Sequence, residues 1–365
     1  MSSSSPLPVA VIGVGGLGEL VLQGLLASRE VKVVGVADRD ARAAEQAAAR
    51  AHLPAYSDNR SLLAETRPAA VYLATPPPAA AELIAACAER GICVWKAPPL
   101  ARSLDEGIAL TALMGKAGAK LAVGTQRRFA PGYRRAWQLR GELGKVFLAR
   151  GHYLFNWGPQ LGWRGDKATA GGGALLELGY HTIDLLLWML GMPEEVYGLA
   201  ARTAADGLIS VHDTDDTAAA ILRFAPDSMA AVVTTRCSGP VSEELSLHGQ
   251  GGSLTASSEW CTLRAPDGNI LDSVKDEIGP VDLFRRQAEA FAATVSSGAD
   301  RYECSARENL LNLAVIEAIY LSDKTSQPEN PTRLLTSRGW DVQECLKQRP
   351  IDQGDAAGAP NSPAL

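Results

Sequence analysis

The sequence predicts an α/β protein with an N-terminal doubly wound parallel sheet of the Rossmann type. A C-terminal α+β domain with an open, mostly antiparallel sheet is expected to follow. Three observations support this class. A glycine-rich loop follows a β-branched run near the N-terminus, strands and helices alternate through the first third, and strand-like runs with turn signals begin at Lys145. The length of 365 residues also fits two domains.

The glycine loop predicts a dinucleotide site. Residues 9–12 lead into GVGGLG at 13–18, a G-x-G-x-x-G sequence, and an apolar-periodic helix follows. Gly13 permits a tight turn, Gly15 lets the backbone approach a pyrophosphate, and Gly18 lets the helix pack against the strand. The cofactor-binding residues predicted in the loop are Gly13, Gly15, Gly16, Leu17 and Gly18.

A second expected strand, residues 31–37, ends at Asp38, twenty residues past Gly18. At this position a carboxylate holds the ribose hydroxyls of the adenosine. The alternative is an ordinary turn residue at the end of a strand. Arg39 follows directly and could pair with a 2′-phosphate, but Asp38 would repel that phosphate. NAD is therefore the predicted cofactor, with NADP as the alternative.

The remaining elements divide the chain. In the first part, helices are expected at 41–51, 61–65, 80–90 and 104–117, and strands at 70–74, 92–95 and 121–124. In the second part, strands are expected at 146–153, 196–202, 217–224, 229–238, 244–249 and 253–257, and helices at 175–190 and 307–321. The expected divisions are a flexible leader 1–8, a dinucleotide-binding domain 9–125, a substrate and oligomerisation domain 126–335 and a disordered tail 348–365.

Composition narrows the function. A net charge of −6 without a basic cluster argues against nucleic acid or an anionic membrane as a partner. The six cysteines show no C-x-x-C and no metal-ligand spacing, so we expect reduced cytoplasmic thiols and no metal. The acids Asp213, Asp215 and Asp216 suggest either a metal or a polar turn before a strand, and the turn is favoured.

A helix expected at 175–190 carries the strongest catalytic candidates. Three glycines at 171–173 precede it, and it contains Glu177, His181 and Asp184. Spacings of four and three residues place these side chains on one helix face. A carboxylate one turn from an imidazole can orient the ring and raise its pKa, as a general acid/base near neutral pH requires. The alternative is a carboxylate–histidine pair in the core, whose two side chains only hydrogen-bond to each other.

Further motifs carry a resemblance. They are ATPP at 74–77, GTQRRFAP at 124–131, WRGD at 163–166, the triple glycine with its Glu-x-x-x-His helix, and NLLNLA at 309–314. With these the chain resembles the glucose–fructose oxidoreductase/inositol dehydrogenase (Gfo/Idh/MocA) family from Val9 to about Pro331. The resemblance implies a Rossmann domain plus an open-faced α/β domain, NAD(P)-dependent oxidation or reduction of sugars and polyols, and oligomerisation through the large sheet.

The resemblance also implies roles for single residues. His181 would be the general acid/base, and Glu177 stands where the family usually has Asp, one methylene shorter. The residues implied at the nicotinamide–ribose side are Thr75, Pro76 and Gln126. Those implied at the substrate are Arg127, Tyr153, Trp163, Arg164, Tyr180 and Asp184. For each tryptophan, packing in the core is the alternative.

Two positions depart from the family pattern. The usual Glu-Lys-Pro, whose lysine assists catalysis, is replaced by KAPP at 96–99, so Lys96 lies two residues early. Because residues i and i+2 of a strand share a face, the ammonium of Lys96 could still point to the same side. A solvated lysine at the end of a strand is the alternative. Ala80 stands where the family often has His.

The sequence thus predicts a cytoplasmic NAD(P)-dependent oxidoreductase acting on a sugar, cyclitol or related hydroxy/keto compound, assembled as a homodimer or homotetramer. Two alternatives stay open. One is a redox-neutral NAD-dependent glycosidase or lyase, in which a transient ketone acidifies the neighbouring C–H. The other is a non-catalytic cofactor-dependent regulator.

Overall fold

A computed structural model describes residues 5–203, 211–224 and 227–347 of the chain. The expected tail at 348–365 and the first four residues of the expected leader lie outside these ranges. The leader is shorter than expected, because the first strand begins at Leu7, which pairs with Val31. Residues 7 and 8 therefore belong to the sheet.

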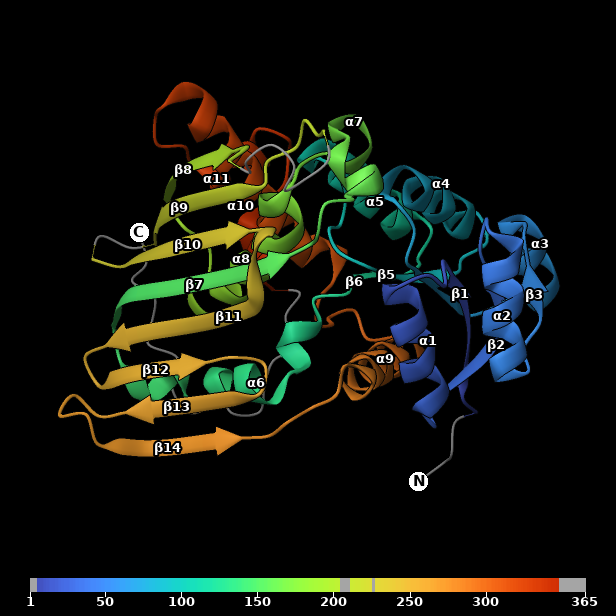
Figure 1. Cartoon of the computed structure of the whole chain (residues 1–365), viewed down its shortest axis with the longest axis horizontal. Helices are drawn as coiled ribbons and strands as arrows, with labels where there is room; N and C mark the ends of the chain where they lie inside the picture. Colours follow the sequence, from blue (N-terminus) through green and yellow to red (C-terminus); the bar gives the residue numbers. More distant parts are fainter. Residues whose placement is uncertain (1–4, 204–210, 225–226, 348–365) are drawn as a thin grey trace.

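The N-terminal sheet confirms the predicted Rossmann architecture (Figure 1). Its strands are β1 (Leu7–Ile12), β2 (Val31–Ala37), β3 (Ala55–Tyr56), β4 (Ala70–Leu73), β5 (Cys93–Lys96) and β6 (Leu121–Val123). They are all parallel, in the order β3-β2-β1-β4-β5-β6. The helices between them are α1 (Leu17–Ala27), α2 (Ala41–Ala51), α3 (Asn59–Thr66), α4 (Pro77–Ala88) and α5 (Leu104–Lys116).

Both faces of this sheet are covered, which explains why its central strands are apolar along their whole length. Side chains of α1 and α2 pack in one core cluster, and those of α3, α4 and α5 pack in the other. Side-chain caps fix several helix starts. Asp40 accepts from the amides of Arg42 and Ala43 at the start of α2, and Ser103 accepts from the amide of Glu106 in α5.

The C-terminal sheet has the order β14-β13-β12-β11-β7-β10-β9-β8, and β7–β10 is its parallel pair. Its strands are β7 (Val146–Asn156), β8 (Glu195–Ala201), β9 (Thr217–Arg223), β10 (Met229–Thr235), β11 (Cys237–Gly249), β12 (Gly252–Ala256), β13 (Trp260–Arg264) and β14 (Ile270–Lys275). The expected strand 229–238 is in fact two, because β10 ends at Thr235 and Cys237 begins β11. Strands β13 and β14 were not predicted.

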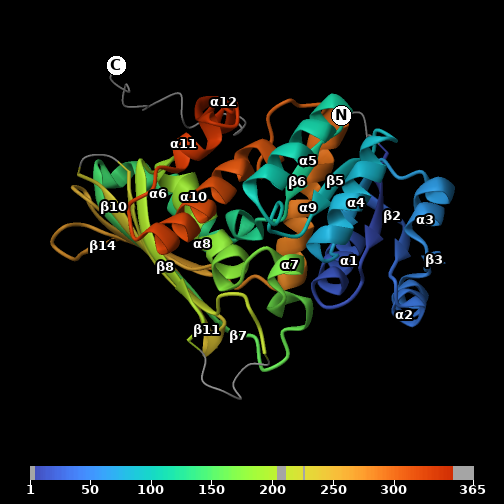
Figure 2. The same cartoon turned by 90° about the horizontal axis from the view of Figure 1, so that it is seen from above.

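Helices α6 (Pro131–Leu139), α8 (Tyr180–Leu190) and α10 (Ala306–Thr325) contact this sheet and cover one face of it. The other helices after β6 are η1 (Gln126–Phe129), η2 (Arg140–Leu143), η3 (Gly162–Gly165), α7 (Lys167–Ala170), η4 (Leu175–Gly179), α9 (Pro280–Ser297), α11 (Pro331–Thr336) and α12 (Val342–Leu346). Figure 2, which shows the sheet nearly edge-on, places α8 and α10 on the same side of it. The expected helix 175–190 begins as a π-helical turn, η4, and continues as α8.

Helix α9 joins the two halves of the fold. It was not predicted, and it lies beside α1 of the first sheet (Figure 1). Its Phe284, Ala288 and Phe291 belong to the same core cluster as α1. A Cβ on Gly24 of α1 would lie 2.9 Å from backbone atoms of α9. The Rossmann core is therefore not confined to residues 9–125, because side chains of residues 280–297 also pack in it.

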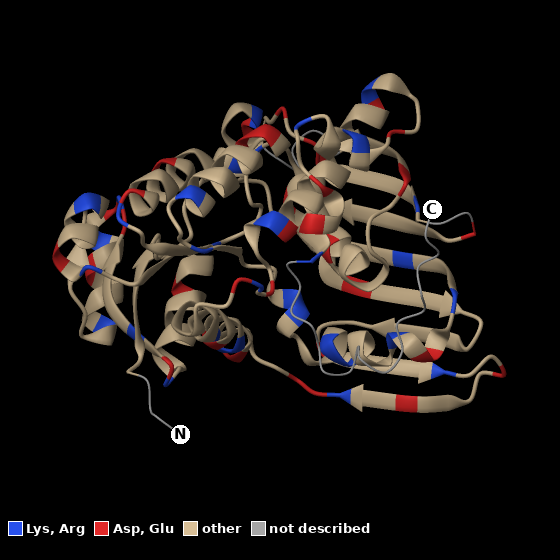
Figure 3. Ribbon diagram, turned by 180° about the vertical axis from the view of Figure 1, so that it is seen from behind, with Lys and Arg blue, Asp and Glu red and all other residues tan. Residues whose placement is uncertain are grey.

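Basic and acidic residues occur together in both halves of the molecule. Figure 3 shows Lys and Arg beside Asp and Glu on the helices around the first sheet and on the strands of the second. This mixture agrees with the modest net charge of −6.

The contact between α1 and α9 predicts the effect of Gly24→Ala. Alanine normally stabilises a helix relative to glycine by about 0.5–1 kcal/mol. At Gly24 the added methyl would meet the α9 backbone, so we expect net destabilisation of about 1–3 kcal/mol.

Gly115→Ala is the matched control, because a Cβ on that α5 glycine has no neighbour within 4 Å. It should be neutral or stabilising. Urea unfolding measures both variants, and equal effects would contradict the close packing of α1 on α9.

Candidate active site

The glycine loop forms a cradle at the carboxyl end of β1. Gly13 has a φ of +88°, and a Cβ there would lie 2.6 Å from the carbonyl oxygen of Ala74. A Cβ on Gly15 or Gly16, in contrast, would have no neighbour within 4 Å. Helix α1 begins at Leu17 without a side-chain cap. The open side of the loop and the first amides of α1 thus suit a pyrophosphate.

Asp38 is held beside this cradle by backbone amides. Its Oδ2 accepts from Val14 N at 2.9 Å, and its Oδ1 accepts from Asp40 N at 3.0 Å. Asp38 is therefore a turn residue, and its carboxylate is also held next to the glycine loop. Each oxygen keeps a further lone pair with which to accept from a ribose hydroxyl. Arg39 beside it is exposed.

The buried polar atoms that lack a hydrogen-bond partner among the described residues include Thr75 Oγ1, Gln126 Oε1 and His181 Nδ1. Thr75 and Pro76 follow β4, and Gln126 opens η1 after β6. The carboxyl ends of these parallel strands meet at one edge of the sheet, where α/β proteins bind ligands. Because buried polar groups are normally paired, these atoms fit the polar edge of a bound cofactor and substrate.

His181 lies near the start of α8 and is 8% exposed. A Cβ on Gly151 of β7 would collide with Thr182, so α8 lies close against that strand. The imidazole meets the Tyr153 ring edge-on, with 6.1 Å between ring centroids. Burial, with a further contribution from the guanidinium of Arg127, holds the pKa of His181 well below 6.5. The ring is therefore neutral at neutral pH and able to accept a proton.

Arg127 and Tyr153 extend this group. The guanidinium of Arg127 lies over the Tyr153 ring, 4.1 Å from its centroid, and its Nε donates to Glu243 at 2.5 Å. The structure thus brings together three residues expected from the sequence, His181, Arg127 and Tyr153. Glu243 was missed. It lies just before the strand expected at 244–249, and nothing in the sequence identified its partner.

Glu177 does not form the expected pair with His181. It lies in the π-helical turn, which alters the assumed spacing, and it accepts from Arg164 Nε at 2.5 Å. The Arg164 guanidinium also lies over two indole rings, at 4.3 Å from Trp163 and 4.2 Å from Trp157. Glu177, Arg164 and Trp163 therefore form a second group, and Trp157 is an unpredicted member of it.

Asp184 and Tyr180 were expected at the substrate, but the structure places both in the core. Asp184 is 1% exposed, and Arg128 donates to its two oxygens at 2.6 and 2.7 Å. The hydroxyl of Tyr180 donates to Asn309 at 2.7 Å. These bonds tie α8 to η1 and α10. The helical spacing correctly identified polar residues on α8, but it could not show which of them face inward.

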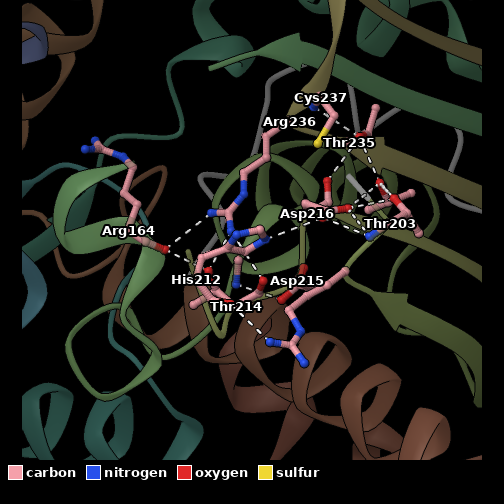
Figure 4. A network of polar contacts seen from close by, with 12 residues as sticks. Arg164, Thr203, His212, Thr214, Asp215, Asp216, Thr235, Arg236 and Cys237 are labelled. Carbon is pink, nitrogen blue, oxygen red and sulfur yellow. Dashed lines mark hydrogen bonds and ion pairs between the residues drawn. The ribbon is translucent and has the colours of Figure 1, made fainter. Parts of the chain in front are cut away.

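The acids at 213–216 have structural partners (Figure 4). Asp215 accepts from the amide of Gly173 at 2.8 Å and so fixes the triple glycine before η4. Asp216 accepts from the Thr203 amide and hydroxyl at 2.7–2.9 Å. Asp213 accepts from a backbone amide of α7. Within the described ranges, no three His, Cys, Asp or Glu residues are arranged to hold a metal ion.

Lys96 is buried at the end of β5, with 4% of its surface exposed. Its Nζ donates to the carbonyl oxygen of Ala97 at 2.7 Å and to that of Pro99. Burial lowers the pKa of Lys96 to about 7, partly offset by Glu106. The solvated alternative is therefore wrong. Ala80, the other departure, is buried in α4.

None of the helices in the described ranges combines the length and the hydropathy that a membrane span requires.

The cradle, the parallel sheet and the neutral imidazole define a dinucleotide-dependent oxidoreductase. Residues 7–125 match an oxidoreductase family with an NAD-binding Rossmann fold, and residues 134–255 match the GFO/IDH/MocA C-terminal domain. The chain belongs to the Gfo/Idh/MocA family of oxidoreductases.

Similar proteins act on several compounds. The chain is 26% identical over 325 residues to D-xylose 1-dehydrogenase (NADP(+)) 2 of Haloferax volcanii, which covers 86% of this chain and 97% of that protein. It is 30% identical over 236 residues to myo-inositol dehydrogenase Hyg17 of Streptomyces leeuwenhoekii, covering 63% and 70%. A levoglucosan dehydrogenase structure with NADH and L-sorbose shares the fold, with a TM-score of 0.83, 22% identity and coverage of 90% and 99%.

The buried amine of Lys96 predicts a pH-dependent stability. An unfolded lysine titrates near pH ~10.4, so between about pH 7 and pH 10 the unfolded chain binds more protons than the folded one. Stability should therefore rise with pH across this window. Relative to Lys96→Met, the native protein should gain about 2 kcal/mol between roughly pH 7.5 and pH 9.5. Urea unfolding at the two pH values measures the gain.

Lys116→Met removes an exposed lysine of α5 and serves as the control. It should follow the native protein. If Lys96→Met also keeps the native dependence on pH, the amine of Lys96 is not desolvated.

Proposed function

We propose that this chain transfers a hydride between NAD and a hydroxyl-bearing carbon of a sugar, cyclitol or related compound. The observation that carries the proposal is the buried, neutral imidazole of His181, with its Nδ1 unpartnered within the described chain. Thr75 and Gln126 also carry buried oxygens that lack a hydrogen-bond partner among the described residues. The named activities of the relatives support the substrate class.

Oxidation of an alcohol needs a base for the hydroxyl proton while hydride leaves the carbon. Bound NAD supplies the hydride acceptor. His181 takes the proton at its unpartnered nitrogen, because the lowered pKa keeps the ring uncharged at neutral pH. In the reverse direction the imidazolium returns the proton. Arg127, with its pKa raised by Glu243 against the effect of burial, stays charged and opposes imidazolium formation. Proton release to water after each oxidation is thereby favoured.

The other residues orient the reactants. In the proposal the loop at 13–18 holds the pyrophosphate, Asp38 binds the ribose, and Thr75, Pro76 and Gln126 line the nicotinamide side. Arg127 and Tyr153 contact the substrate next to His181. The Trp163 ring, with Arg164 over it, offers a flat face for a sugar.

Lys96 is proposed as a positioning residue. Its two carbonyl partners lie in the segment that leaves β5 toward this edge of the sheet. Lys96→Met should lower turnover without moving the midpoint of the pH–rate profile. A catalytic ammonium beside His181 would instead hold the pKa of the base down, and its loss would move that midpoint upward.

The outer face of the C-terminal sheet supports the expected homodimer or homotetramer. It exposes apolar side chains on four neighbouring strands: Leu148, Tyr197, Leu199, Ile221, Met229 and Val233. Exposed apolar surface of this kind is typical of an interface. A monomeric mass by sedimentation at micromolar concentration would exclude the assembly.

His181→Ala tests the mechanism. Turnover should fall by about 10²–10⁴-fold, the usual effect of losing a general acid/base, with little change in NADH affinity. The assay follows NADH absorbance over a panel of sugars and cyclitols that includes D-xylose, myo-inositol and levoglucosan.

His248→Ala, a histidine on β11, is the control and should retain turnover. Near-normal turnover of His181→Ala would show that His181 is a core residue without a catalytic role. Substrate conversion without accumulating NADH would identify the redox-neutral glycosidase or lyase. Cofactor binding without turnover on any substrate would identify a regulator.

Asp38 tests the cofactor. The native protein should bind NADH more tightly than NADPH, because Asp38 accepts from ribose hydroxyls and repels a 2′-phosphate. Asp38→Ser should narrow or reverse the preference, since Arg39 can then pair with the phosphate. Calorimetric titration of both cofactors measures it.

Asp40→Ser is the matched control, because it removes a carboxylate two residues away and leaves a residue able to cap α2. The preference should persist in this variant. Tighter NADPH binding by the native protein would overturn the assignment.

A further inference from the structure

One cavity is lined by none of the residues proposed at the active site. It has a volume of about 440 Å³ and lies between α9, α6, the end of α8 and residues 301–304. Neither His181 nor the glycine loop lines it. A cavity of this size is within the range that small-molecule ligands occupy.

Gln287 gives the cavity an unusual polar wall. It is 3% exposed, and both its amide nitrogen and its amide oxygen lack a hydrogen-bond partner among the described residues. Trp95, another lining residue, is 2% exposed and its Nε1 is likewise unpartnered there. Such groups are costly to bury alone. Together the two side chains carry three N–H donors and one carbonyl acceptor in the lining of the cavity.

The opposite wall is cationic and aromatic. Arg134 donates to Glu303 at 2.7 and 3.0 Å and lies 5.2 Å from the centroid of Trp188. Trp188 stacks on Trp137. Arg301 is exposed and also lines the cavity. In all, four arginines and one acid line it: Arg128, Arg134, Arg140, Arg301 and Glu303. Arg128 is already paired with Asp184 and Glu308, and Arg134 with Glu303. Arg301 has no ion pair among the described residues and is the cation placed to meet an anion in the cavity.

We propose that this cavity binds a small polyhydroxylated organic anion, such as a sugar phosphate or a sugar acid. Arg301 would hold the phosphate or carboxylate, the amide of Gln287 would exchange hydrogen bonds with a hydroxyl, and the indole rings would pack against the C–H face. The charged, amide and aromatic residues of the lining would thus each contact a different part of the ligand. The proposal does not depend on hydride transfer.

Calorimetric titration with glucose 6-phosphate and gluconate tests the site. At least one should bind, and whichever is tighter identifies the preferred anion. Glucose and inorganic phosphate should each bind at least about tenfold more weakly, because each lacks one half of the recognised chemistry. Binding of neither anion, or equal binding of glucose, would overturn the proposal.

Two variants locate the binding. Gln287→Leu should weaken binding of the tighter anion by about tenfold or more and leave thermal stability equal or higher, since it removes an unpartnered amide. Arg301→Ala, at the exposed rim, should weaken it as well and leaves the core untouched. Arg286→Ala, an exposed neighbour on α9 that does not line the cavity, is the control and should bind normally. Normal binding by both Gln287→Leu and Arg301→Ala would refute the site.

Discussion

The buried ion pair network around Arg128 is the constraint on which the candidate site depends. Arg128, Asp184 and Glu308 are each 1% exposed, and they come from η1, α8 and α10. Burial opposes the charge, but the two carboxylates hold the pKa of Arg128 well above its usual value. Asn312 adds a bond of 2.9 Å to Asp184. Removing one member of such a network leaves a buried charge unpaired, so the three elements are locked together.

This network lies directly behind the chemistry. Arg128 follows Gln126 and Arg127 on η1, and Asp184 is one turn beyond His181 on α8. Fixing Arg128 to Asp184 therefore fixes the base and the residues beside it in one frame. The second group, Glu177 with Arg164 and Trp163, is attached through η4, which continues directly into α8 and whose start is held by Asp215.

The features of the fold that were predicted correctly are those that local sequence patterns determine. The glycine loop, the strand–helix alternation and the helix expected at 307–321, which is α10, are confirmed, because periodicity and turn residues act over short distances. Strand β13 was not predicted, although its buried Cys261 and Leu263 alternate with less buried residues. The partners of Glu177 and Asp184, in contrast, could not be predicted from local patterns. Both pair with arginines from other elements, and helical spacing contains no information about side chains 13 and 56 residues away. Lys96 is a further case, since a charge two residues out of register gave no sign that it would be buried.

The position of α9 has a consequence for synthesis of the chain. One face of the Rossmann sheet and α1 is covered by residues 280–297, which leave the ribosome after more than three quarters of the sequence. Until then the nascent N-terminal segment exposes an apolar surface that its own residues do not cover. Folding of the cofactor domain is thus completed late, and the nascent chain presents a surface of the type that chaperones recognise.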